Sequence, residues 1–197
     1  KEIHIVQISS VGSANLEECS FLFDYFKVIT DKKIHLHLYT KPNTLSKEEI
    51  INSFNKIYGS IMDPKYFHLH DPQDPKSLIK EISKFDFGII IPNPKAQCKD
   101  NLEAKSALGN KNSAYLEAGI PFFYPPELEF QDSILRKYGL SLHIKNINDV
   151  SKIKRQLKKI NYKELEKKII HAREDFLMEK HFPELLEFIK KVVKKKK

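Results

Sequence analysis

Residues 85–94, FDFGIIIPNP, form an apolar run that ends at two prolines. Polar and apolar positions do not alternate in this run, so a strand formed here has to be covered on both faces. Such strands are typical of the centre of a parallel sheet, because parallel sheets are buried between layers of helices. The segment therefore predicts an α/β protein with helices on both faces of its sheet.

Strand patterns and helix patterns alternate along the rest of the chain. Two of the helix patterns begin with capping signals, Ser46 with Glu49 and Asp74 before Pro75. Strands separated by helices of about 10 to 15 residues indicate βαβ units and an open parallel sheet. We therefore expect a Rossmann-like three-layer α/β domain. The further strands are expected at residues 2–9, 33–40, 66–70, 120–125 and 140–145, and the helices at 16–30, 46–59, 74–85, 132–139 and from about Lys111 to Gly119.

From about residue 149 the pattern is entirely helical. We expect a Rossmann-like domain at residues 1–148, C-terminal helices at 149–193 that pack on the same domain, and a disordered basic tail at 194–197. Residues 151–197 hold 16 Lys and Arg against 7 Asp and Glu, whereas residues 1–150 hold 18 against 19. The excess positive charge is therefore confined to the C-terminal helices.

Three interpretations of this basic segment remain open. A solvated face on packed helices is favoured, and attraction to anionic lipid headgroups comes next, since each lysine near such a surface contributes roughly 1 kcal/mol. Nucleic acid is not expected as a partner, because no aromatic interleaving or recognised nucleic-acid-binding motif accompanies the lysines.

The bulk composition restricts the class of protein. No apolar run reaches the roughly 18 to 20 residues that span a bilayer, and no signal-peptide pattern precedes the first strand. The strand-like sequence begins almost at Lys1, which suggests a processed start or a domain of a longer protein. Two cysteines, Cys19 and Cys98, cannot build a disulfide framework, so we expect a cytoplasmic protein with reduced thiols.

Three loops follow predicted strands, at residues 9–15, 92–112 and 124–133. In doubly wound sheets, ligands bind outside the carboxyl ends of the strands, near helix N-termini that favour anions. The loop at 92–112 leads into a helix that begins near Lys111. Backbone amides with a lysine beside them suit a pyrophosphate, although an ordinary surface loop would have the same composition.

The segments 85–94, 109–125 and 135–150 together resemble the C-terminal domain of GT-B glycosyltransferases, and the tail at 161–189 is similar to their closing helices. The resemblance implies a domain that binds a nucleotide-sugar donor, with a separate N-terminal domain for the acceptor. It implies no cofactor and no metal ion bound by the protein. On this basis Lys111 is expected to bind the donor diphosphate. The further candidate donor-binding residues are Gly12, Ser13, Asn93, Asn110, Ser113 and Tyr115.

The chain departs from the family pattern at two acidic positions. Many members carry two glutamates eight residues apart before the helix-ending glycine; Ser106 and Ala114 occupy those positions here. The cation that often follows the first strand is also missing from residues 9–15. The catalytic residue is therefore unknown, and the pattern suggests a divergent or inactive donor site.

Three functions remain open at this point. The first is the donor-binding domain of a glycosyltransferase that is active only when full length, with the isolated domain inactive. The second is a non-catalytic GT-B-like module for binding or assembly, and the third is a nucleotide-sugar epimerase. Since acceptors in this family are often linked to membranes, the basic helices would suit peripheral attachment at the inner face of the membrane.

Two H-x-H pairs, His35 with His37 and His68 with His70, each place two imidazoles on one side of a strand. Two such imidazoles can share a metal ion, but a site needs further ligands. We expect half-buried strand histidines without a metal. The sequence contains no G-x-S-x-G, Walker A or G-x-G-x-x-G motif, so ordinary NAD or ATP binding is not expected.

Overall fold

A computed structural model describes residues 2–9, 20–40, 46–59, 63–92, 102–106 and 108–194. Within these residues, five strands form one sheet in the order β3-β2-β1-β4-β5, and all four neighbouring pairs are parallel. This confirms the predicted Rossmann-like parallel sheet. The strands are β1 His4–Ile8, β2 His35–Tyr39, β3 Phe67–His70, β4 Phe87–Ile89 and β5 Phe122–Phe123.

The expected strand at residues 140–145 is wrong. This segment makes only an isolated parallel bridge, between His143 and Tyr124. The backbone amides of Tyr124 and Ile144 donate to Leu142 and Tyr124 respectively. The alternating pattern there reflects burial of Leu140 and Ile144 under the domain rather than a sixth strand of the sheet.

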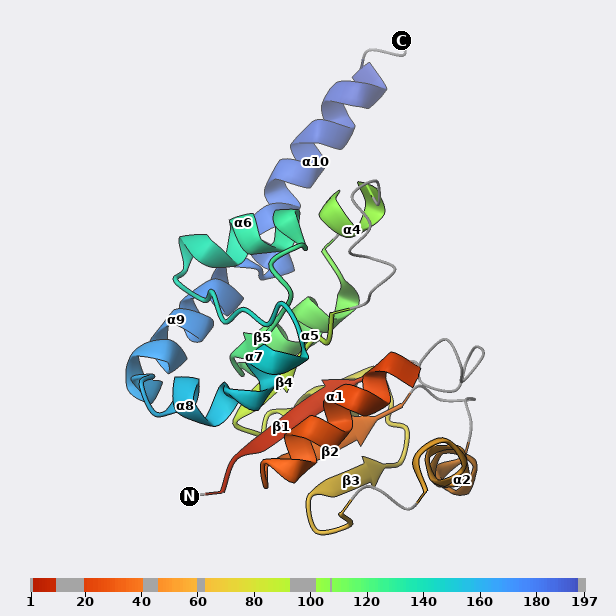
Figure 1. The fold of residues 1–197 in the computed structure, drawn as a ribbon. Helices are drawn as coiled ribbons and strands as arrows, with labels where there is room; N and C mark the ends of the chain where they lie inside the picture. Colours follow the sequence, from red (N-terminus) through yellow and green to blue (C-terminus); the bar gives the residue numbers. More distant parts are fainter. Residues whose placement is uncertain are drawn as a thin grey trace.

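Helices follow the strands and continue as far as Lys194 (Figure 1). The predicted caps are present, because Ser46 and Glu49 form a capping box and Asp74 accepts from the amides of Lys76 and Ser77. The helices are α1 Ser20–Asp31, α2 Lys47–Tyr58, α3 Pro75–Ile82, α4 Leu102–Ser106, α5 Asn110–Ala118, α6 Glu129–Lys137, α7 Ile147–Ser151, α8 Ile153–Leu157, α9 Tyr162–Asp175 and α10 Met178–Lys194.

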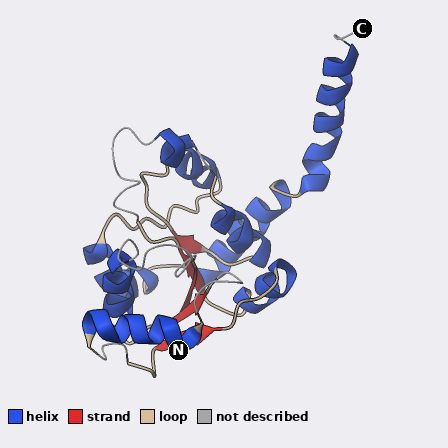
Figure 2. Ribbon diagram, turned by 90° about the vertical axis from the view of Figure 1, so that its right-hand side faces the viewer, coloured by secondary structure: helices blue, strands red, loops and turns tan. Residues whose placement is uncertain are grey.

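An aromatic cluster holds α1 and α2 on the sheet. Phe23 and Phe26 of α1 surround Phe54 of α2, with ring centroids 3.8 and 6.2 Å from it. Phe67 of β3 packs against both Phe26 and Phe54. All three phenylalanines of the helices are buried, so this cluster forms the core of one helical layer. Helices lie on either side of the sheet when it is seen edge-on (Figure 2).

Helix α5 is attached to the sheet by Tyr115, which is fully buried. Its hydroxyl lies 3.1 Å from the carbonyl oxygens of Val6 and Ile89, and it accepts a hydrogen bond from the amide of Ile8 at 3.2 Å. The ring lies directly over Gly88 of β4, where a β-carbon would come within 2.7 Å of it. Gly88 is therefore required for α5 to approach the sheet this closely.

The C-terminal helices divide into two groups. Helices α7, α8 and α9 bury apolar side chains in the core, among them Val150, Ile153 and Ile169. Helix α10, which was expected to pack on the same domain, instead extends away from it in both views (Figures 1 and 2), and its side chains from Met178 to Val193 are exposed. Lys194 ends α10, and residues 195–197 lie outside the described part of the chain.

Among the described residues, no helix combines the length and the apolar character that crossing a membrane requires.

Replacing Gly88 with alanine tests the contact that seats α5. The added β-carbon would overlap the Tyr115 ring, so we expect Gly88→Ala to lower the free energy of unfolding by about 1–3 kcal/mol in urea denaturation. Gly109→Ala is the control, because its β-carbon would meet only the Asn112 side chain at an ordinary 3.6 Å. The control should cost at most about 1 kcal/mol. Equal losses in the two variants would contradict this account of the contact.

Candidate functional site

From β1 the chain continues to β2 and β3 on one side of the sheet, and it then crosses to β4 and β5 on the other side of β1. The strand order therefore reverses between β1 and β4. In open parallel sheets, ligands bind at this switch point, outside the carboxyl ends of the strands. Helix α5 begins in the connection that follows β4 and is anchored over β1 and β4 by Tyr115. The topology therefore brings the first turn of α5 to the switch point, beside the carboxyl ends of β1 and β4.

The N-terminus of α5 has no side-chain cap. Gly109 occupies the N-cap position with φ −69°, and no acidic residue lies in the first turn. Asn110 and Lys111 are its first two residues, and Lys111 is half-buried. A helix N-terminus carries roughly half a positive charge, and a lysine beside it adds to the attraction for an anion.

Other helices that follow strands at this edge are less suited to an anion. The N-terminus of α2 is capped by Ser46 and has Glu48 and Glu49 in its first turn, and that of α3 is capped by the carboxylate of Asp74. Helix α6 begins with Glu129 and includes Asp132 in its first turn. Of these four helices, only α5 combines an uncapped start, a first turn without acidic residues and a cation.

The predicted donor-binding residues are distributed unevenly over the structure. Asn110 and Ser113 are exposed and line one groove of about 740 Å³. Residues of α3 and α9 also line this groove. Tyr115 is buried, with its hydroxyl engaged by the sheet backbone, so it holds α5 in place. Gly12, Ser13 and Asn93 lie outside the described residues. The donor contacts of all these residues stay predictions.

A buried polar contact joins the first turns of α5 and α6. Asn112 is fully buried, and its Nδ2 donates to Oε1 of Gln131 at 2.5 Å. Asn112 Oδ1 and Gln131 Nε2 are also buried, and neither has a hydrogen-bond partner within the described residues. Because buried polar atoms are usually paired, this contact leaves one acceptor and one donor unused beside the candidate site.

A second polar cluster surrounds the buried carboxylate of Asp132 in α6. Asp132 accepts hydrogen bonds from the Tyr124 hydroxyl at 2.9 Å, from His143 Nε2 at 2.7 Å and from Arg136 Nη2. Burial by itself would raise the pKa of Asp132, but the hydrogen bonds from His143, Tyr124 and Arg136 outweigh it and lower this pKa. The ionised carboxylate therefore ties the segment after β5 to α6.

The pKa of Tyr124 shifts in the opposite direction from that of Asp132. Burial raises the pKa of its hydroxyl, and the hydrogen bond to Asp132 raises it further. The tyrosine stays protonated and acts as a donor. Since three side chains already donate to the carboxylate of Asp132, the cluster organises the edge of the site rather than offering a free base.

The two positions where the family often has glutamate lie near the same region. Ser106 ends α4, and its hydroxyl donates to the Leu102 carbonyl oxygen at 2.7 Å. Ala114 lies in α5, partly buried, and lines the same groove as Asn110 and Ser113. Glu117, one turn further along α5, also lines that groove and is the acidic residue nearest to Ala114 on this helix.

Sequence reasoning missed Gln131, Asp132 and His143. The i, i+4 spacing of Asp132 and Arg136 is a signal for a helical ion pair, but such pairs are usually exposed. Nothing in the local pattern indicates that this carboxylate is buried or that His143 reaches it. The contact depends on the segment after α6 returning beside Tyr124.

Residues 29–186 match the family model described as "Glucosyltransferase 3-like, C-terminal domain". No curated protein matches the chain.

Several solved structures share the fold at low sequence identity. The GtfA/B complex superposes with a TM-score of 0.64 at 11% identity over 98% of this chain and 36% of that chain. The pneumococcal O-GlcNAc transferase GtfA, solved with UDP and GlcNAc, gives 0.58 at 10% identity over 97% and 36%. TarM from S. aureus, solved with fondaparinux, alpha-GlcNAc-glycerol and UDP, gives 0.59 at 14% identity over 94% and 35%. The chain thus spans about a third of the length of these structures.

The Asp132 cluster generates a prediction on stability and pH. Asp132→Asn removes the charge that three donors share, so we expect it to lower the free energy of unfolding at pH 7 by roughly 2–4 kcal/mol. The pKa of Asp132 is lowered in the folded state, so its contribution is present above the unfolded pKa of about 3.9 and is lost as pH falls through the lower folded pKa.

Urea denaturation of both proteins between pH 7 and pH 3 measures this effect. The difference between wild type and Asp132→Asn should shrink below about pH 4. Asp31→Asn is the matched control, because Asp31 pairs with Lys27 on an exposed surface and the substitution should cost less than about 1 kcal/mol. A difference that stays constant down to pH 3 would show that the carboxylate charge is not what stabilises the cluster.

Proposed function

Because the chain belongs to the family of glucosyltransferase 3-like C-terminal domains, we propose that the first turn of α5 binds the diphosphate of a nucleotide sugar. The observation that supports this most directly is electrostatic. At the switch point, α5 has an uncapped N-terminus, no acidic residue in its first turn, and Lys111 as its second residue. A diphosphate carries the charge that this combination favours.

The resemblance to GT-B glycosyltransferases that the sequence indicates agrees with the family and with the fold. In our proposal, Asn110 and Ser113 contact the donor from the exposed side of α5. The unused acceptor of Asn112 and donor of Gln131 lie at the join with α6, next to this turn. Tyr115 positions α5 through the sheet, and the buried Asp132 cluster holds the neighbouring start of α6.

Two of the similar structures contain UDP, so a uridine nucleotide is the first donor to test. Lys111 and the α5 amides would stabilise the negative charge that develops on the departing nucleoside diphosphate. Preorganised donors of this kind can supply much of the catalytic effect in group transfer without a protein nucleophile. The sugar and the acceptor are not specified by any residue that the structure describes.

Transfer itself would require a second domain. The chain spans about a third of the length of the solved structures that share its fold. We therefore propose that the acceptor-binding half lies in a part of the protein outside this sequence, and that the domain alone binds a donor without transferring sugar. The alternative, a non-catalytic binding or assembly module, differs in one respect: the longer protein would also bind nucleotide without turnover.

Helix α10 is the surface on which such a second domain fits best. Its apolar residues are exposed, and Met178, Phe182, Leu185, Ile189 and Val192 recur with the alternating spacing of four and three residues that packed helices use. The helix carries four lysines against three glutamates, so its charge is nearly balanced. This favours a protein surface over an anionic membrane, although the lysines after α10 would suit the membrane surface.

The donor proposal predicts a specific effect of Lys111. We expect this chain to bind UDP in isothermal titration calorimetry, and Lys111→Ala to weaken binding by about tenfold or more, since a charge-assisted hydrogen bond contributes about 1.5–3 kcal/mol. Lys32→Ala is the matched control, because Lys32 lies after α1, at the opposite edge of the sheet from α5. It should bind UDP as tightly as the wild type.

Absence of UDP binding up to millimolar concentration, with GDP, ADP and CMP equally silent, would contradict a donor site in this domain. Equal loss in Lys111→Ala and Lys32→Ala would mean that the interaction is a general charge effect. Binding together with sugar release by the longer protein would exclude the non-catalytic alternative.

The α10 proposal predicts protection from solvent in the longer protein. Hydrogen exchange of the α10 amides should be slower there than in this chain, and Leu185→Glu should remove the difference, because it places a charge in the apolar seam. Glu187→Gln is the control, since Glu187 points away from that seam and should leave protection unchanged. Fast exchange in both proteins, with sedimentation on phosphatidylserine vesicles, would instead identify a membrane-binding helix.

A further inference from the structure

Five histidines share one face of the sheet at three neighbouring strands. They come from β1 (His4), from β2 (His35 and His37) and from β3 (His68 and His70). In the register of the sheet, His4 lies opposite His35, and His37 lies opposite His68. Since alternate residues of a strand face the same side, the two H-x-H pairs and His4 form one continuous group of imidazoles.

Hydrogen bonds connect these rings in two chains. His4 Nδ1 lies 2.9 Å from His37 Nε2, and His37 Nδ1 lies 2.9 Å from His70 Nε2. In the other chain, His35 Nδ1 lies 3.0 Å from His68 Nε2. In each bond an Nδ1 faces an Nε2, so all three can have the same polarity, with every Nδ1 protonated and donating.

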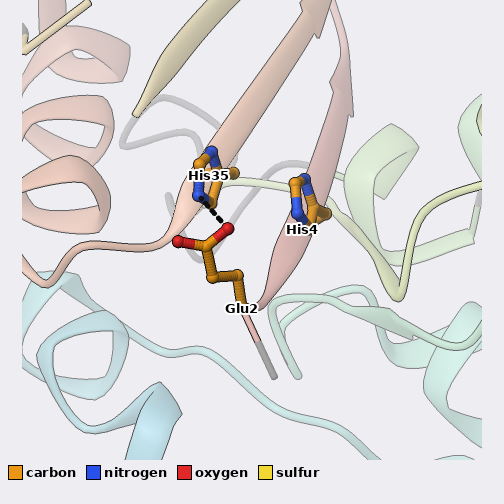
Figure 3. A group of neighbouring side chains, drawn as sticks. All are labelled: Glu2, His4 and His35. Carbon is orange, nitrogen blue, oxygen red and sulfur yellow. Dashed lines mark ion pairs between the residues drawn. The ribbon is translucent and has the colours of Figure 1, made fainter. Parts of the chain in front are cut away.

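Glu2, which precedes β1, adds a carboxylate beside the first histidines of β1 and β2 (Figure 3). Glu2 lies two residues before His4, and its Oε2 is 3.4 Å from Nε2 of His35. The His35 side chain is nine-tenths buried, yet its Nε2 has no hydrogen-bond partner among the described residues. One ligand atom each from Glu2, His4 and His35 lie within 4.8 Å of one another. The buried Nε2 of His35 therefore lies beside the Glu2 carboxylate, and the His35 ring stacks on the His4 ring with their centroids 4.3 Å apart.

We propose that Glu2, His4 and His35 bind a zinc ion at the amino edge of the sheet. Zinc binds imidazole nitrogen at about 2.0–2.1 Å and carboxylate oxygen at about 2.0–2.2 Å. The two imidazoles come from positions that are paired across neighbouring strands, so the backbone already holds them together. The Glu2 side chain is 66% exposed and can adjust its rotamer to complete the site.

The surrounding histidines supply the outer contacts that metal-binding imidazoles usually have. With every Nδ1 protonated, His4 donates to His37 and His35 donates to His68, and Nε2 of His35 faces the Glu2 carboxylate. This tautomer leaves Nε2 unprotonated for binding zinc, and a hydrogen bond from the second nitrogen is what normally fixes it. His37 Nε2 and His68 Nε2 are the acceptors of these two hydrogen bonds, at 2.9 and 3.0 Å.

The ligand types distinguish between metal ions. Two imidazoles and one carboxylate suit zinc, cobalt, nickel or copper, whereas magnesium and calcium prefer sites made of oxygen atoms. Three protein ligands leave the fourth position of a tetrahedral zinc for water. The sequence led us to expect half-buried histidines without a metal at the two H-x-H pairs, within each of which both histidines belong to one strand. The structure instead pairs His35 with His4 across strands and adds Glu2.

This site is separate from the donor site. Glu2, His4 and His35 precede or begin their strands, whereas α5 begins beyond the carboxyl ends of the strands. Zinc here would join the starts of β1 and β2. We therefore expect it to raise the melting temperature of the domain without changing the affinity for UDP, so the two proposals can fail independently.

Zinc titration of this chain, free of any affinity tag and stripped with EDTA, tests the site by calorimetry. We expect one zinc ion per chain, and cobalt in its place should give visible absorption from a site with nitrogen ligands. Glu2→Gln and His4→Gln should each weaken zinc binding by at least about tenfold. His68→Gln should weaken it by about 10- to 100-fold, as expected for an outer hydrogen-bond partner.

His171→Gln is the matched control, because His171 lies on α9 beside Asp175, with 3.4 Å between Nε2 and the carboxylate oxygen. This variant removes an exposed pair of a histidine and a carboxylate, a kind of surface site that binds metals weakly. It should leave the affinity of the chain for zinc unchanged. Glu2→Gln changes an exposed side chain, so it should fold even if His4→Gln does not. Absence of saturable binding at one ion per chain would overturn the proposal, as would unchanged affinity in Glu2→Gln or equal loss in His171→Gln.

Discussion

The contact of Tyr115 with Gly88 determines where the candidate site can lie. A side chain at position 88 would displace the ring, and loss of the hydroxyl would leave backbone groups of β1 and β4 without their partner. Because both strands flank the switch point, one tyrosine holds the first turn of α5 at the place where this topology binds ligands. Tyr115 thus connects the core of the sheet to the candidate site without having to contact a ligand itself.

Charge distinguishes this helix from its neighbours at the same edge. The amides that begin α2 and α3 are satisfied by Ser46 and Asp74, side chains that stabilise a helix start but compete with an external anion. At α5 the N-cap residue is Gly109, which offers the backbone no such substitute. The missing cap destabilises the helix locally, and burial of Tyr115 and Leu116 compensates for it. A ligand anion could occupy the position that a capping side chain takes elsewhere.

How much could be predicted from the sequence depended on whether a feature was local. The apolar run at 85–94, the capping signals at Ser46 and Asp74, and the glycine after α5 are local, and they gave the parallel sheet and most helices. The segment 140–145 has a strand pattern, but only the chain returning beside Tyr124 decides that it pairs at a single bridge. The buried state of Asp132 and the joining of Asn112 to Gln131 likewise depend on helices packing over long sequence separations. The amphipathic pattern of helix α10 indicates that one of its faces is suited to burial. The pattern does not identify the surface against which that face packs.

A parallel sheet with helical crossovers gives its two edges opposite electrostatic character. Each crossover helix begins at the carboxyl edge of the sheet and ends at the amino edge, so its positive and negative ends lie at opposite edges. At the carboxyl edge, α5 presents its N-terminus together with Lys111. At the amino edge, α1 ends at Asp31 before the chain enters β2 at His35, where the imidazoles of β1 and β2 meet Glu2. The same topology that favours an anion at one edge favours a cation at the other, and the polar residues of this chain follow that division.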